Sequence, residues 1–232
     1  MLTHVDKTYD IRVDGEGCEV TFLIVGGGGR AGQGGGGAGS GHIQYGSLQV
    51  SSGTVMTARV GRGGVHEYPG APAQSSSVTF SDNGDTITAQ PGQDGICCLG
   101  SGGDGYSGGG TCGYDYGGDG GSDGSDGKNG SYNNTSGGKG TGEDISHYSF
   151  STWTLAPGPE GAAYFYCPSC PIQVPRAYYG GGGGGVLINR AGPEASRYQG
   201  QGYGGGGSGW RVSYGDVNYG DGLPGVILLE IN

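Results

Sequence analysis

Glycine at every third position is the feature that most limits how this chain can fold. The spacing occurs in two tracts, at Gly26, Gly29, Gly32 and Gly35, continued by Ala38 and Gly41, and at Gly118, Gly121, Gly124, Gly127 and Gly130. A three-residue period is typical of the polyproline II geometry, which has three residues per turn and no internal hydrogen bonds. Its backbone groups must therefore pair with neighbours, and glycine lets those neighbours approach. The spacing predicts a bundle of short polyglycine II helices, and the alternative is a set of flexible linkers.

Apolar residues gather in strand-sized runs, and these runs decide between order and disorder. Glycine and proline account for 61 and 10 of the 232 residues, a level that is typical of disordered chains. However, residues 22–25, 186–188 and 226–229 are continuous hydrophobic runs. Such runs supply the apolar surface that offsets the entropy lost on ordering. We therefore expect one ordered domain over residues 1–232, with a glycine-rich, acidic insertion at 99–142.

Strand patterns are frequent, whereas the helical spacing of apolar residues is absent. The expected strands are 9–13, 19–25, 43–50, 54–60, 77–81, 85–90, 162–166, 186–189, 210–214 and 226–231. Turn residues at 51–53 and at 82–84 predict two hairpins, the second of them through Asn83-Gly84, which accepts positive φ. About ten strands without helices predict an all-β sandwich or barrel.

The formal net charge of −10 limits the partners of the chain. Binding to nucleic acid requires clustered Lys and Arg, and anionic membranes attract the same residues. No run approaches the 18 apolar residues of a membrane span, and no apolar signal segment follows Met1. We expect no nucleic-acid partner and no membrane insertion. The chain either starts after a removed signal or leaves its cell by another way, such as virion assembly.

Six cysteines are candidates for disulfide bonds, because an even count in a chain with a modest core favours bridges. They are Cys18, Cys97, Cys98, Cys112, Cys167 and Cys170. We expect at least two bridges, with Cys167 and Cys170 bonded rather than catalytic. A zinc site and free thiols are the alternatives.

The remaining motifs predict no catalytic residue, metal site or cofactor. Residues 27–32 match G-x-G-x-x-G, but the glycines at 34–37 exclude the helix that a dinucleotide site needs. Acidic residues between 104 and 126 match no calcium loop and indicate a solvated face. Asn129, Asn133 and Asn134 begin glycosylation sequons. The 16 tyrosines either present rings to sugars or proteins, or cap the glycine bundle.

The order of segments resembles that of a known family. A hydrophobic strand, 20–25, leads into glycines 26–29 and 34–37, followed by the strands 42–45 and 55–60. In the second half, glycines 180–185 precede 186–189, and glycines 204–207 precede the final strand. This order resembles the glycine-rich domain of phage tail-fibre proteins, large DNA viruses and marine invertebrates. More remotely, it is similar to the extracellular glycine-rich domain of anaplastic lymphoma kinase-type receptors.

The resemblance implies a jelly-roll or tumour-necrosis-factor-like β-sandwich with inserted polyglycine II helices. It also implies a non-enzymatic structural or attachment protein at an exterior surface, associated with a virion or a fibre. Its partner would be a protein or glycan at a surface, and the chain would form a homo-oligomer or part of a larger assembly. The alternatives are a secreted matrix or adhesive protein of a marine animal, or a receptor-type glycine-rich domain that binds a ligand.

Overall fold

Antiparallel sheets make up the computed structural model of the chain. The structure describes residues 1–5, 7–15, 17–32, 36–65, 70–96, 103–105, 148–157, 163–167, 177–179, 202–207 and 220–232. All regular elements in these ranges are strands, which confirms the predicted all-β class. The described ranges contain no helix with the length and hydrophobicity to cross a membrane.

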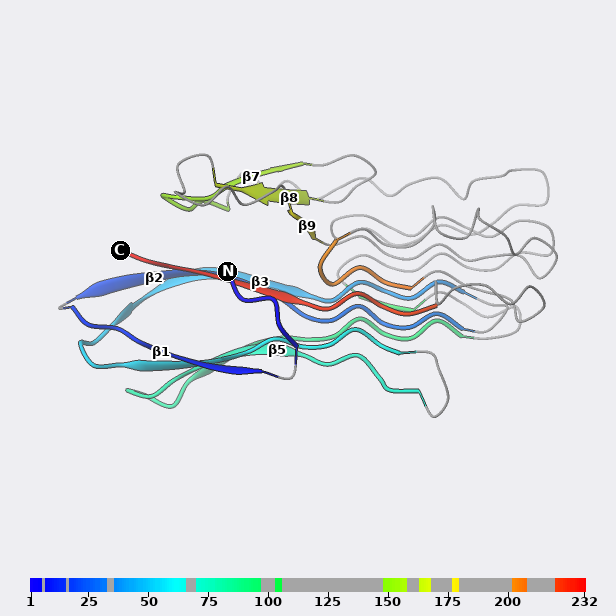
Figure 1. Cartoon of the computed structure of the whole chain (residues 1–232), viewed down its shortest axis with the longest axis horizontal. Helices are drawn as coiled ribbons and strands as arrows, with labels where there is room; N and C mark the ends of the chain where they lie inside the picture. The colour runs from blue at the N-terminus through cyan, green and yellow to red at the C-terminus, as the bar shows by residue number, and fades with distance from the viewer. Residues whose placement is uncertain are drawn as a thin grey trace.

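The strands form three sheets in layers (Figure 1). The first sheet has the order β1-β4-β5-β6, from β1 (Thr8–Arg12), β4 (Val55–Arg59), β5 (Ser76–Phe80) and β6 (Thr86–Ala89). The second has the order β10-β2-β3, from β2 (Cys18–Val25), β3 (Ile43–Val50) and β10 (Val226–Ile231). The third has the order β7-β8-β9, from β7 (Thr154–Pro157), β8 (Ala163–Tyr166) and β9 (Ala177–Tyr179). The second sheet is the middle layer.

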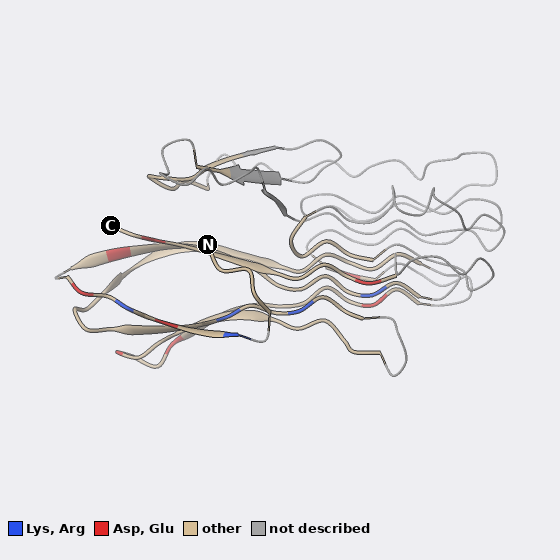
Figure 2. Ribbon diagram, viewed as in Figure 1, with Lys and Arg blue, Asp and Glu red and all other residues tan. Residues whose placement is uncertain are grey.

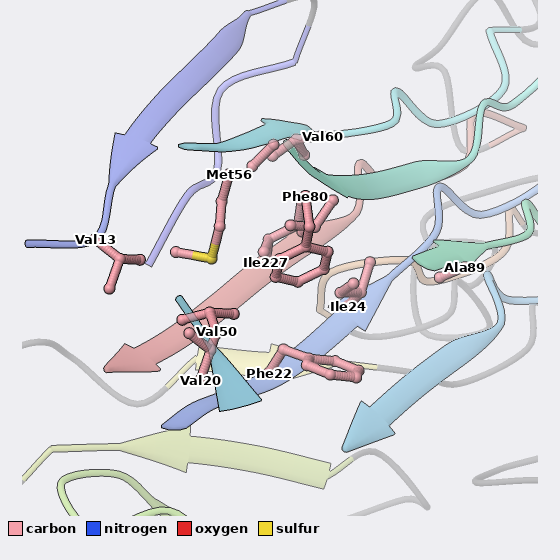
Figure 3. Close-up of a cluster of buried hydrophobic side chains, with 12 residues drawn as sticks. Val13, Val20, Phe22, Ile24, Val50, Met56, Val60, Phe80, Ala89 and Ile227 are labelled. Atoms are coloured by element: carbon pink, nitrogen blue, oxygen red, sulfur yellow. The ribbon is translucent and has the colours of Figure 1, made fainter. Parts of the chain in front are cut away.

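The main hydrophobic core lies between the first and second sheets (Figure 3). Alternate residues of each strand point into it, because side chains of a strand alternate between its two faces. From β2 these are Val20, Phe22 and Ile24, and from β5 they are Val78 and Phe80. This arrangement is the sandwich that the sequence predicts, with the strands 19–25, 54–60 and 226–231 in their expected places within a few residues.

A second hydrophobic cluster covers the opposite face of the middle sheet. Leu23 and Val25 of β2 and Val226 and Leu228 of β10 are fully buried there. Aromatic residues from segment 148–153, which precedes β7, pack over them. The middle sheet is therefore buried on both faces, which explains why the runs at 22–25 and 226–229 are continuously apolar rather than alternating.

The hairpin predicted at residues 51–53 is wrong. β3 and β4, which flank this turn, belong to different sheets and do not pair with each other. The turn instead carries the chain across the sandwich, since Val50 and Met56 on its two sides enter the same core. Burial of these side chains against each other favours the crossing over a local pairing.

The hairpin predicted at residues 82–84 is confirmed, because β5 and β6 pair directly on either side of it. Gly84 has a φ of 74°, the left-handed conformation that the Asn-Gly pair accommodates. The strand predicted at 162–166 appears as β8, whereas the short strands β7 and β9 were not predicted. The strands predicted at 186–189 and 210–214 lie outside the described residues.

Candidate functional site

Glycine-rich segments continue the strands at one end of the sandwich. The chain leaves β2, β4 and β6 into segments 26–32, 61–65 and 90–96, and it returns through 36–42, 71–75 and 220–225 into β3, β5 and β10. Figure 1 shows these segments running side by side away from the sheets. Together with residues 103–105 and 202–207, which are hydrogen-bonded to them, they form what we call the glycine bundle.

Successive backbone N–H groups of segment 26–32 point in three different directions. Successive groups donate to three neighbouring segments, 36–42, 71–75 and 220–225, and the first and last of these recur after three residues. The bonds run from Gly26 to His42, Gly27 to Gln74, Gly28 to Leu223, Gly29 to Gly39 and Ala31 to Gly220, with N···O distances of 2.7–3.0 Å.

The carbonyl groups of the same segment point to three further neighbours. They accept N–H groups from segments 90–96, 61–65 and 202–207, and the first of these also recurs after three residues. The bonds run to Gly27 from Gly92, to Gly28 from Gly64, to Gly29 from Gly207 and to Arg30 from Gly95. Segment 26–32 therefore lies among six described segments and is bonded to all of them.

Segment 36–42 shows the same three-residue rule. Ala38 and Gly41 both donate to segment 202–207, at the carbonyls of Gly207 and Gly204. A strand, which has a two-residue period, cannot place residues i and i+3 against one neighbour. A threefold helix does so at every turn. We interpret the bundle as packed polyglycine II helices, an interpretation that the first substitution in the Discussion tests.

Close backbone contact explains why glycine occupies these positions. A Cβ atom built on Gly26 or Gly29 would overlap a carbonyl oxygen, that of Gln90 or Gln93 respectively. Gly32 lies in the same segment, with its N–H directed to the carbonyl of Gly36. The other predicted packing residues lie outside the described residues, namely Gly35, Gly118, Gly121, Gly124, Gly127 and Gly130.

An ion pair replaces one backbone bond of the pattern. The N–H of Arg30, three residues after Gly27, would be directed to Ala71, but the carbonyl of Ala71 already accepts the N–H of Val65. Asp94 takes its place, because its Oδ1 accepts this N–H at 3.0 Å and its Oδ2 accepts Nε of Arg30 at 2.7 Å. Figure 2 shows charges of both signs on neighbouring bundle segments. One carboxylate thus joins segments 26–32 and 90–96.

Asp94→Ala is expected to lower the free energy of unfolding by about 1 kcal/mol, since one backbone N–H and one guanidinium lose their acceptor. The pair is about one-third exposed, which limits the effect through solvent screening. Urea denaturation measures it. Asp14→Ala is the matched control, because the Arg12–Asp14 pair has a similar bond of 3.0 Å but is 70% and 78% exposed. An equal loss in the two variants would contradict the assigned role of Asp94.

Two of the six predicted disulfide cysteines lie in the described ranges, and they differ. Cys18 of β2 is a free, half-buried thiol, so its place among the disulfide candidates is wrong. It stands at the solvent end of its strand beside Gly15, where a Cβ atom would lie 2.8 Å from its sulfur. Cys167, after β8, is buried and disulfide-bonded. Cys97, Cys98, Cys112 and Cys170 lie outside the described residues, so the predicted number of bridges stays a prediction.

The backbone of residues 27–32, which match G-x-G-x-x-G, is hydrogen-bonded to other segments of the protein. The N–H groups of Gly27, Gly28 and Gly29, which a dinucleotide would need, all donate to protein carbonyls. Within the described ranges, His, Cys, Asp and Glu form no group of three that could hold a metal ion. The sequons at Asn129, Asn133 and Asn134 lie outside these ranges, as does the insertion at 99–142 except for residues 103–105, which are bonded into the bundle.

Three side chains that the sequence did not single out join separate parts of the fold. Ser76, fully buried where β5 begins, accepts the N–H of Gly61 and donates to the carbonyl of Val25. Tyr45 and Glu230 bind segment 148–153 to the middle sheet. Ser76 lies within a run of serines, and Glu230 is a single glutamate at the end of an apolar strand. Neither position has a sequence pattern that would have identified its side chain.

The sandwich and the bundle together define a glycine-rich all-β protein. A family model described as a glycine-rich domain matches residues 3–232, and the chain belongs to this family. The predicted glycine-rich family is therefore confirmed, while the remoter resemblance to the receptor domain stays a prediction. No curated protein and no solved structure matches the chain.

Proposed function

We propose that the chain is a non-enzymatic structural or attachment protein at an exterior surface, associated with a virion or a fibre. It would meet a protein or a glycan at that surface, as a homo-oligomer or as part of a larger assembly. The glycine bundle is the observation that carries the proposal. Its segments are held by backbone bonds in several directions, so that its shape depends little on the side chains it exposes.

The glycine bundle could therefore serve as a rigid spacer that presents residues at the end remote from the sheets. Each outgoing segment is bonded to incoming neighbours along its described length, which resists bending and local opening. A rigid scaffold that carries connecting loops is a common arrangement for binding surfaces.

Two large apolar residues are exposed at the bundle end remote from the sheets. Ile96 is 57% exposed, and its carbonyl accepts the N–H of Gly36. Val65 is 37% exposed and pairs with Ala71. These two residues serve to test the proposed contact, because they are the large apolar side chains that are exposed on the described bundle segments.

Mass spectrometry of virions purified from the source of the sequence tests the proposed location. We expect peptides of this chain in the particles at a level comparable with other surface components. Finding the chain only in secreted matrix would overturn virion association in favour of a secreted adhesive protein.

The proposed attachment is tested by binding of the full chain to host cells and to a glycan array. The double variant Val65→Asp, Ile96→Asp is expected to weaken binding at least tenfold without lowering the melting temperature. Val5→Asp is the matched control, because Val5 is equally exposed at 37% but lies beside Val60, at the end of β4. Equal binding by the two variants would refute the role of the bundle end.

A further inference from the structure

Segment 148–153, which we call the cover segment, lies over the outer face of the middle sheet. Its aromatic residues Tyr148, Phe150 and Trp153 are half-buried against the cluster formed by β2 and β10. Tyr45 of β3 joins the same cluster and stacks on Tyr148 with ring centroids 4.7 Å apart. The cover segment therefore keeps an apolar sheet face out of water.

Polar bonds hold the cover segment at Glu230, at Tyr45 and at a third point, where the hydroxyl of Ser151 donates to Oδ1 of Asn232 at 3.0 Å. The carboxylate of Glu230 accepts the backbone N–H groups of Ser151 and Thr152, each at 2.6 Å. The hydroxyl of Tyr45 donates to the carbonyl of Ser149 at 2.7 Å and accepts the N–H of Ser149 at 2.8 Å. The first point depends on an ionised group, because a carboxylate accepts with both oxygens whereas a carboxylic acid donates with one of them.

No Lys, Arg or His among the described residues forms an ion pair with Glu230. The titratable groups on the same sheet face are Glu19 of β2 and Tyr45 of β3, and the cover segment contributes Tyr148. The register partner of Glu230 is Thr21, which is uncharged. Only 7% of Glu230 is exposed, so its negative charge is stabilised by N–H and hydroxyl donors of the cover segment.

We propose that the cover segment is an acid-releasable cap on the apolar face of the middle sheet, with the carboxylate of Glu230 as its latch. Protonation of Glu230 places a hydrogen on one carboxyl oxygen, which then no longer accepts the N–H that faces it, and the bond to the other oxygen is weakened because its acceptor has lost the charge. The bonds between Tyr45 and Ser149 and the bond from the hydroxyl of Ser151 to Asn232 do not involve the carboxylate of Glu230. Release removes the three aromatic side chains of the cover segment from the buried cluster of Leu23, Val25, Val226 and Leu228, against which Leu155 and Tyr203 also pack.

The direction of the pH dependence follows from the environment of Glu230. Burial would raise the pKa of its carboxyl, but the hydrogen bonds from Thr152 and Ser151 outweigh burial and hold the pKa below its ordinary value of 4.5. A carboxyl with a lowered pKa stabilises the bound state at pH values above its unfolded pKa. This stabilisation is lost as the pH falls through the lowered value. The latch is therefore closed at neutral pH and opens below pH 4.5.

Hydrogen exchange of the full chain, followed by mass spectrometry from pH 7 to pH 3 and corrected for intrinsic rates, tests the latch. In the wild type, protection of the Ser151 and Thr152 amides is expected to fall about tenfold to a hundredfold in the acid range, the effect of losing bonds to a charged group. Amides of the β2–β10 ladder are expected to stay protected through that step. Loss of protection at both places together would overturn the proposal.

Glu230→Gln and Glu19→Gln distinguish this latch from a general effect of acid. Glu230→Gln is expected to show the low protection of Ser151 and Thr152 already at pH 7, with no further step on acidification. Glu19→Gln, which removes the other carboxylate of the same face, is expected to keep the wild-type step. A step that persists in Glu230→Gln would overturn the proposal. If Glu230→Gln does not fold, the wild-type profile and the Glu19→Gln control decide the matter.

Discussion

Gly29→Val is expected to lower the free energy of unfolding by about 3–9 kcal/mol, because a side chain there would disturb three buried backbone bonds and each unpaired group costs about 1–3 kcal/mol. Gly29 donates to Gly39 and accepts from Gly207, and a side chain would displace the carbonyl of Gln93, which accepts the N–H of Gly39. Whole domains are stable by only about 5–15 kcal/mol. The variant should therefore be largely unfolded or melt far below the wild type, as urea denaturation and thermal melting will show.

Gln93→Val is the matched control for Gly29→Val. Gln93 contributes the carbonyl that a side chain at position 29 would displace, but its own side chain is exposed. Valine there keeps the backbone bonds of the bundle and is expected to change stability by about 0.5 kcal/mol or less. If Gly29→Val and Gln93→Val melted at the same temperature, segment 26–32 would behave as a flexible linker, and the polyglycine II interpretation would fail.

Ser76→Ala is expected to lower the free energy of unfolding by about 2–4 kcal/mol, mainly because a buried N–H group loses its acceptor. The hydroxyl of Ser76 accepts the N–H of Gly61 at 2.9 Å and donates to the carbonyl of Val25 at 2.7 Å. These bonds join β5 to the first residue of segment 61–65 and to the end of β2, where strands become bundle segments. Alanine removes both bonds, and because Ser76 is fully buried the two backbone groups are left away from bulk water.

Ser77→Ala is the control for Ser76→Ala. Ser77 is the next residue of β5 and points to the opposite, half-buried face of the strand. Its replacement is expected to change stability by about 0.5 kcal/mol or less. Comparable losses in the two serine variants would mean that the hydroxyl of Ser76 does not join the sheets to the bundle.

Strand positions could be predicted because their signal is local. In β5 the apolar residues Val78 and Phe80 alternate with polar ones, and this two-residue period both identifies a strand and assigns its buried face. The Asn83-Gly84 pair likewise identifies its turn, because it adopts the left-handed conformation that the hairpin needs. These features need no knowledge of distant residues.

The pairing of β3 could not be predicted in the same way. Residues 51–53 are suitable for a hairpin, and nothing near them indicates that β3 pairs with β2 while β4 pairs with β1 and β5. The decision comes from Val50 and Met56, whose burial in one core favours a turn that crosses between sheets. Glu230 could not be identified for the same reason, because its partners in the cover segment precede it by 78 and 79 residues.

The sequence by itself determined that the chain has strands, where most of them lie, and that its glycines follow a three-residue period. Only the tertiary structure decided which segments are neighbours in the glycine bundle. Glycine has no side chain that could distinguish one segment from another, so the sequence carries no label that brings Gly28 next to Leu223 or Gly29 next to Gly39. Those neighbours are set by the strands from which the segments emerge, since the pairing of β2 with β3 and β10 places segment 26–32 between 36–42 and 220–225.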